Sequence, residues 1–218
     1  MHNTICYELH KLFNGVKRYT FETIDDIPFD NGIYIFFEKG EKYGEFDRIV
    51  RVGTDTGQNQ LKSRMRQHLT KENKDRSIFR KNIGRAMLAK ENNPLLNYWN
   101  IDFTTKKNKE LFFDEKKFAE CAVIEKDIST FMKENLSFVV FCVNTKEERL
   151  RFEKGIISAL YNADDFVASA EWLGNYVPET KGTHVKKSRM WLSQGLRAKP
   201  LDNKELKKIQ LLCQQNNF

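Results

Sequence analysis

The helix expected after Thr145 carries a carboxylate in the middle of its apolar face. Projected at 100° per residue, its hydrophobic side chains cover one continuous arc, and Glu153 falls near the centre of that arc. An unpaired carboxylate buried there costs on the order of several kcal/mol, so it must be paired, hydrogen-bonded or bound to a metal. Glu153 is therefore either the partner of a core Arg or Lys, or a metal-ligating or catalytic group.

A second pair of chemical groups lies one helical turn apart. Residues 60–69 are expected to be helical because apolar side chains recur at every fourth position, at Leu61, Met65 and Leu69. Arg64 and His68 are also four residues apart and project together beside that stripe. A histidine in such a place is, taken alone, more often a surface residue than a functional one.

The positive charge of the chain is concentrated around this helix. Residues 62–85 contain nine basic and two acidic side chains, and their excess of seven equals the net charge of the whole chain, +7. A concentrated basic segment is typical of a protein with a polyanionic partner. The alternative is a solvated basic surface with no partner.

Composition excludes several classes of protein. The 218 residues are 40% hydrophobic and 12% aromatic, which is enough apolar surface to fold and excludes global disorder. No apolar run approaches 18 residues and no secretion signal precedes the first strand, so we expect neither a membrane partner nor export. The cysteines, Cys6, Cys121, Cys142 and Cys213, are widely spaced, as in reduced thiols of a cytoplasmic protein rather than a zinc site.

The elements that must position these residues form an α/β pattern. Two β-branched and aromatic runs at 33–37 and 48–54, joined by a polar turn at 38–47, predict an antiparallel hairpin, and 138–143 predicts a third strand. Helices are expected at 60–69, 77–90, 114–134, from 145 onward and at 203–215. We therefore predict one α/β domain with a small, mostly antiparallel sheet of three or slightly more strands flanked by helices. Its expected parts are an N-terminal extension (1–26), the main domain (27–198) with an irregular insertion near 91–113, and a C-terminal helix (199–218).

Four motifs occur in an order that is known from one protein family. Gly32-Ile33-Tyr34, Arg51-Val52-Gly53, Arg64-x-x-x-His68 and then Glu153 on a later helix resemble the GIY-YIG nuclease superfamily over residues 27–165. Asn162 resembles the Asn that many members carry after the glutamate helix. Later segments, such as 172–176, resemble those of stand-alone bacterial members. One departure is plain, because Arg51 stands where the second family motif normally begins with Tyr.

The resemblance implies metal-dependent hydrolysis of phosphodiester bonds. Glu153 would hold one divalent cation, Mg²⁺ or Mn²⁺. Tyr34 would orient or deprotonate the attacking water, and Arg64 would bind the scissile phosphate. Arg51 could stabilise the transition state, His68 could position the nucleophile or a phosphate, and Asn162 could hold substrate or a metal-bound water. Without these roles, Tyr34 would be a core aromatic and Arg64 a structural partner of Glu153.

The resemblance also gives the basic segment a role. Its side chains would follow the DNA phosphates on either side of the cut, and the expected contacts are Lys62, Arg66, Arg80, Lys81 and Arg85. The expected activity is therefore a DNA endonuclease. Two alternatives stay open, a catalytically inactive nucleic-acid-binding module of the same fold and an RNA-directed nuclease. One active site per chain would favour a homodimer, or two sequential nicks, for a double-strand cut.

Overall fold

A three-stranded sheet forms the centre of the protein. The computed structural model describes residues 4–215, and its strands are β1 (Gly32–Tyr43), β2 (Phe46–Thr54) and β3 (Leu136–Cys142). The strand order is β2-β1-β3, and β1 runs antiparallel to both neighbours. The run Ile33–Phe37 is buried on both faces, as its uninterrupted apolar sequence predicts. The expected α/β class with a small antiparallel sheet is confirmed.

The β1–β2 hairpin is longer than its sequence suggests. The strands continue to Tyr43 and resume at Phe46, so the expected ten-residue polar turn is wrong. Its polar residues extend the strands because two carboxylates point inward and find partners there. Glu41 forms a buried ion pair with Arg48, and Glu38 accepts hydrogen bonds from two tryptophan side chains. Gly44 provides the positive φ that the tight turn requires.

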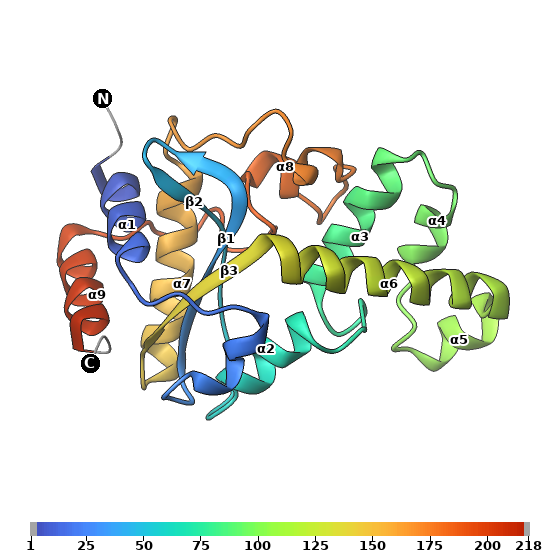
Figure 1. Ribbon diagram of the computed structural model, residues 1–218, viewed down its shortest axis with the longest axis horizontal. Coiled ribbons are helices and arrows are strands. Elements are labelled where there is room, and N and C mark those ends of the chain that lie inside the picture. The colour runs from blue at the N-terminus through green and yellow to red at the C-terminus, as the bar shows by residue number, and fades with distance from the viewer. Residues whose placement is uncertain (1–3, 216–218) are drawn as a thin grey trace.

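One face of the sheet is covered by helices from both ends of the chain. Helices α1 (Thr4–Asn14), α7 (Lys146–Tyr161) and α9 (Asn203–Gln215) lie together on the left of Figure 1 and pack into one cluster with Ile33 and Ile35. The α7 helix begins as expected, because the Thr145 side chain accepts a hydrogen bond from the Glu148 amide. The terminal helices, expected as additions, therefore contribute to the main core.

The opposite face carries a second, largely aromatic core. Tyr34 and Phe36 point into it, and it is covered by α2 (Leu61–Leu69), α3 (Ile78–Lys90) and α6 (Glu115–Asn135). Helix α6 continues directly into β3 (Figure 1). Phe118 of this helix is half exposed. One face of β1 thus carries side chains that only pack in the core, and the opposite face carries Tyr34.

The remaining elements are short. The insertion near 91–113 is helical rather than irregular, since it contains α4 (Leu95–Trp99) and α5 (Lys106–Phe112). The C-terminal third contains α8 (Val185–Ser188) and a 3₁₀ turn at Leu173–Tyr176, and a further 3₁₀ turn spans Phe21–Asp26. Among residues 4–215, no helix is long and apolar enough to cross a membrane.

Candidate active site

The candidate site lies at the edge of the sheet where strand β2 meets helices from both faces. Tyr34 comes from β1 and Arg51 from β2, Arg64 and His68 come from α2, and Glu153 comes from α7. β2 is an edge strand, α7 packs against it, and Arg51 of β2 interacts electrostatically with Tyr34, Arg64 and Glu153. The fold therefore brings together five of the six side chains that the sequence singled out.

Tyr34 and His68 are joined directly. The Tyr34 hydroxyl lies 3.0 Å from His68 Nε2, and the other ring nitrogen, Nδ1, lies 2.8 Å from Ser77 Oγ. All three side chains are buried. Burial lowers the pKa of His68 well below its usual value, and the nearby Arg51, Arg64 and Arg80 lower it further. His68 is therefore a neutral imidazole that fixes the Tyr34 hydroxyl.

A glycine makes room for this hydroxyl. Tyr34 pairs with Gly53 across the β1–β2 ladder. A Cβ atom at Gly53 would lie 2.4 Å from Tyr34 Oη and 2.5 Å from Cζ, far inside van der Waals contact. Gly53 therefore lets the phenol ring lie across the edge strand with its hydroxyl toward α2.

Arg51 is held inside the protein beside Tyr34. Its Nη1 donates to the Trp191 carbonyl oxygen, and its guanidinium carbon lies 4.6 Å from the centre of the Phe79 ring. Burial lowers the pKa of the guanidinium, while Tyr34 and Glu153 raise it. Its Nε is buried and has no hydrogen-bond partner among residues 4–215. A buried donor left without a partner is unusual and could bind an anionic substrate oxygen.

Glu153 faces an open groove. Its Oε1 accepts a hydrogen bond from the Thr54 amide at 3.2 Å. Burial raises the pKa of its carboxyl group, and Arg51 is the strongest opposing influence. No Lys or Arg of the described chain comes within 4.0 Å of this carboxylate, so the interpretation as a core ion pair does not hold. Glu153 and Arg51 both line a cavity of about 390 Å³ between α7 and the C-terminal loop.

Arg64 lines a second cavity on the other side of Thr54. It is half-buried, with Nη1 donating to Gln67 and to the Arg76 carbonyl oxygen. This cavity measures about 480 Å³ and contains Asp55, Gly57 and Gln60 of the loop before α2. Arg64 can therefore reach a phosphate in the cavity while its α2 neighbour His68 stays in the core.

The arrangement fits a singly ligated hard cation better than a metal cluster. Within residues 4–215, no three His, Cys, Asp or Glu side chains come together as a ligand set. One groove-facing carboxylate, completed by water and phosphate oxygens, is the kind of site that Mg²⁺ accepts. Glu153 is the side chain that would hold such an ion.

Sequence reasoning missed a group that braces the site. Arg149, one turn before Glu153, donates to the carbonyl oxygens of Val143, Asn144 and Gly57 and lies 3.5 Å from Asp55. It thereby joins the start of α7 to the loop that leads to Arg64. Its position four residues before Glu153 was the available signal.

Asn162 does not join the cluster. It follows Glu153 by nine residues, which in a helix is two and a half turns and a rise of about 13 Å, so it faces the opposite side. Asn162 caps the end of α7, is exposed, and donates to Ser158 Oγ at 3.1 Å. The structure therefore gives no support to a role for Asn162 beside Glu153, and that role stays a prediction.

Two of the expected DNA contacts are wrong. Arg80 is completely buried, where it pairs with Glu125 and donates to the His68 carbonyl oxygen. Lys81 is 8% exposed and pairs with Asp75 at 3.0 Å. Arg80 joins α3 to α6, and Lys81 joins α3 to the loop before it, so neither side chain can follow a DNA backbone.

The remaining expected contacts are accessible to different degrees. Arg66 is exposed and pairs with Asp25, and Lys62 is half-buried beside the same 3₁₀ turn. Arg85 is half-buried and hydrogen-bonded to Asn82 and Asn100. The segment also exposes Lys71 and Arg76, which the sequence analysis did not single out.

The three-stranded sheet and the side chains clustered at its edge define an α/β protein whose arrangement is that of a nuclease domain. Comparison with protein families agrees: residues 4–217 match the GIY-YIG domain. The chain belongs to this family, whose members are endonucleases, and the match covers nearly its whole length. Comparisons with curated proteins and with solved structures find no match.

Proposed function

We propose that this protein is a divalent-metal-dependent endonuclease that hydrolyses DNA phosphodiester bonds at the cluster of Tyr34, Arg51, Arg64, His68 and Glu153. The observation that carries the proposal is Glu153, a half-buried carboxylate that has no ion-pair partner among residues 4–215 and lies in a groove that it shares with Arg51. A carboxylate in such a place is costly to keep unless a cation binds it. Mg²⁺ or Mn²⁺, when bound, would neutralise charge on the phosphate.

In this proposal Tyr34 orients the attacking water. If its hydroxyl donates to His68 Nε2 across 3.0 Å, the phenol oxygen keeps lone pairs that accept a hydrogen bond from water. The three surrounding arginines disfavour a charged imidazole, so His68 acts by holding Tyr34 rather than by storing the proton. Attack forms a bond from the water oxygen to phosphorus and breaks the bond to the leaving oxygen, and the proton that the water loses passes through solvent to that leaving oxygen.

Arg64 and Arg51 supply the positive charge that this transition state needs. Arg64 lines the neighbouring cavity from α2, while Arg51 shares the groove with Glu153 and has an Nε without a hydrogen-bond partner among residues 4–215. Arginine suits this task because its planar guanidinium matches two phosphate oxygens and stays charged. The exposed cations of α2 and of the following loop, Arg66, Lys71 and Arg76, would bind flanking phosphates.

A plasmid assay tests the proposal. Supercoiled DNA incubated with the protein should be nicked when Mg²⁺ or Mn²⁺ is present and not when EDTA is added. Glu153→Ala should lower the nicking rate by about 100-fold or more. Glu147→Ala, which removes an exposed glutamate from the first turn of the same helix, should nick like the wild type. Equal nicking by the Glu153 variant would refute the site.

A binding module without catalysis is the second candidate. Arg51 stands where the family carries Tyr, and its guanidinium is tied to Trp191, which is the observation that favours this alternative. It predicts salt-sensitive DNA binding with no metal-dependent cleavage. Measuring affinity and cleavage in one sample separates the two functions, and offering RNA beside DNA tests an RNA-directed nuclease.

The absence of a membrane-spanning helix in the described chain is compatible with a cytoplasmic location, which we retain as part of the proposal.

A further inference from the structure

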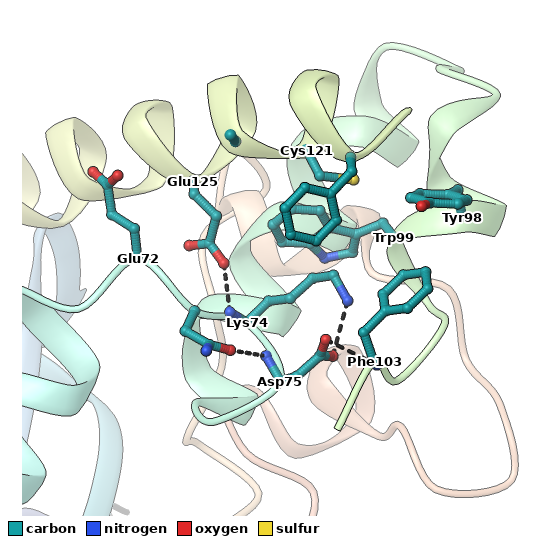
Figure 2. A pocket seen from close by; sticks show the side chains of 11 residues that line it. Glu72, Lys74, Asp75, Tyr98, Trp99, Phe103, Cys121 and Glu125 are labelled. Atoms are coloured by element: carbon teal, nitrogen blue, oxygen red, sulfur yellow. Dashed lines mark hydrogen bonds and ion pairs between the residues drawn. The ribbon is translucent and has the colours of Figure 1, made fainter. Parts of the chain in front are cut away.

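A third cavity lies apart from the two that line the candidate active site and shares no lining residue with them. It measures about 170 Å³ and is enclosed by the loop before α3, by α4 and by α6. Figure 2 shows the rings of Trp99, Phe103 and Tyr98 around it. Phe118 of α6 forms a fourth aromatic wall, with its ring centre 6.3 Å from that of Phe103. Much of its wall is therefore aromatic.

The charged groups around the cavity balance one another. Lys74 Nζ lies 2.8 Å from Asp75 and donates to the Ile101 carbonyl oxygen, as the dashed lines at Asp75 in Figure 2 partly show. Asp75 also forms an ion pair with Lys81, and Glu125 forms an ion pair with Arg80. With Glu72 at the rim, three carboxylates line the cavity together with one cation, Lys74, and the charges balance only when Arg80 and Lys81 behind the wall are counted. The absence of a net charge favours a neutral ligand over an organic cation or an anion.

The size and the remaining polar groups narrow the ligand further. An engineered cavity of about 150 Å³ binds a single benzene ring, so this cavity suits one six-membered ring. Lys74 uses two of its three N–H donors, and the carboxylates of Glu72 and Glu125 keep acceptor lone pairs. A flat, neutral ring with both acceptors and donors on its edge matches these groups. A pyrimidine base is such a ring.

The cavity is connected to the active site by one short loop. Arg64 donates to the carbonyl oxygen of Arg76 at 3.5 Å, and the next residues toward the N-terminus, 72–75, line the cavity. Exposed cations, Lys71 and Arg76, stand on either side of these lining residues. A strand with a phosphate at Arg64 therefore meets further phosphate-binding side chains on its way to the cavity.

We propose that this cavity binds one unpaired pyrimidine base of the nucleic-acid strand that is cut at the active site. The inference rests on the proposed nuclease function and specifies its substrate. A base pair is too large for a one-ring cavity, so the bound strand carries an unpaired base near the cut, as in a single strand, a bulge or a flap. Stacking on the aromatic walls would select the ring without reading a long sequence.

Abasic scanning tests the proposal without cleavage. Single-stranded pyrimidine oligonucleotides of about a dozen nucleotides, each with one base removed at a different position, are titrated onto the protein in EDTA. For the wild type, one position should lower affinity by about tenfold or more, because stacking is worth roughly 1–3 kcal/mol per base. A purine at that position should restore less affinity than a pyrimidine.

Two matched variants assign this effect to the cavity. Phe118→Ala removes a wall that is 50% exposed, and Phe112→Ala removes a phenylalanine that is 48% exposed on α5 and does not line the cavity. The abasic penalty should vanish in Phe118→Ala and persist in Phe112→Ala. Plasmid cleavage with a flat abasic profile, or an unchanged penalty in Phe118→Ala, overturns the cavity assignment but leaves the nuclease function intact. Failure of the wild type to bind or cut any nucleic acid overturns both proposals.

Discussion

Replacing Gly53 with alanine is the sharpest test of how the site is built. The new Cβ atom would lie 2.4 Å from Tyr34 Oη, whereas unstrained contacts are about 3.5–4.0 Å. The phenol ring must therefore retreat by about 1 Å, which would also break its 3.0 Å contact with His68. A displacement of that size can cost roughly 100-fold in rate. Crowding of the buried ring should lower stability by about 1–3 kcal/mol.

The assay is the initial rate of plasmid nicking in Mg²⁺, with urea unfolding measured on the same preparations. Gly15→Ala is the control, because its Cβ would meet the carbonyl oxygens of Leu12 at 3.4 Å and of Lys11 at 3.8 Å and no atom closer than these. Combining Gly53→Ala with Tyr34→Phe should be no worse than Tyr34→Phe alone, since both changes remove one function. If Gly53→Ala is folded and nicks within about threefold of the wild type, the role given to the Tyr34 hydroxyl is refuted.

Three further outcomes are expected. Burial raises the pKa of the Glu153 carboxyl group, so ionisation of this group opposes folding at neutral pH. Glu153→Gln should therefore be inactive but melt at a higher temperature than the metal-free wild type at pH 7. The difference in melting temperature should disappear below about pH 4.5, where the wild-type carboxyl group is protonated in both states. Arg80→Ala leaves Glu125 unpaired in the core and should lower the free energy of unfolding by about 3–5 kcal/mol in urea titrations. Arg66→Ala, in contrast, should leave the stability unchanged and reduce the slope of log DNA affinity against log salt concentration by about 1. His68 has a lowered pKa, so its protonation favours the unfolded chain, and the stability of the protein should fall as the pH drops below about 6.5. His68→Gln should flatten this dependence of stability on pH. An NMR titration of the wild type should find the imidazole still neutral at about pH 6.5.

The sheet and the position of Glu153 could be predicted because their signals are local. The run Ile33–Phe37 has the composition of a buried strand, and Glu153 interrupts an otherwise apolar helical arc. Arg64 and His68 were placed on one helix by their spacing. Each inference needed only the period of a single element, which the chain shows directly.

The fate of the basic side chains could not be predicted in this way. Arg80 and Arg66 both lie in the same charged segment, but only Arg80 meets a buried carboxylate, and that carboxylate is 45 residues further along the chain. Charge density reports how many cations a segment has, not which of them are paired inside. Asn162 is a different case, because the resemblance supplied only a residue type, while the helical period turns it away from Glu153.

The outer edge of β2, which pairs with no other strand, has a consequence for where the domain ends. The Trp191 amide donates to the Val50 carbonyl oxygen at 2.7 Å, so the segment near α8 covers the outer edge of the strand that carries Arg51. The motifs that resemble the family end near residue 165, which makes a shorter catalytic fragment tempting. Such a fragment would leave an unpaired, hydrophobic strand edge in solvent, the kind of surface that recruits other strands. Truncation there should yield aggregates rather than a minimal nuclease, because the C-terminal third shields the edge on which the chemistry is built.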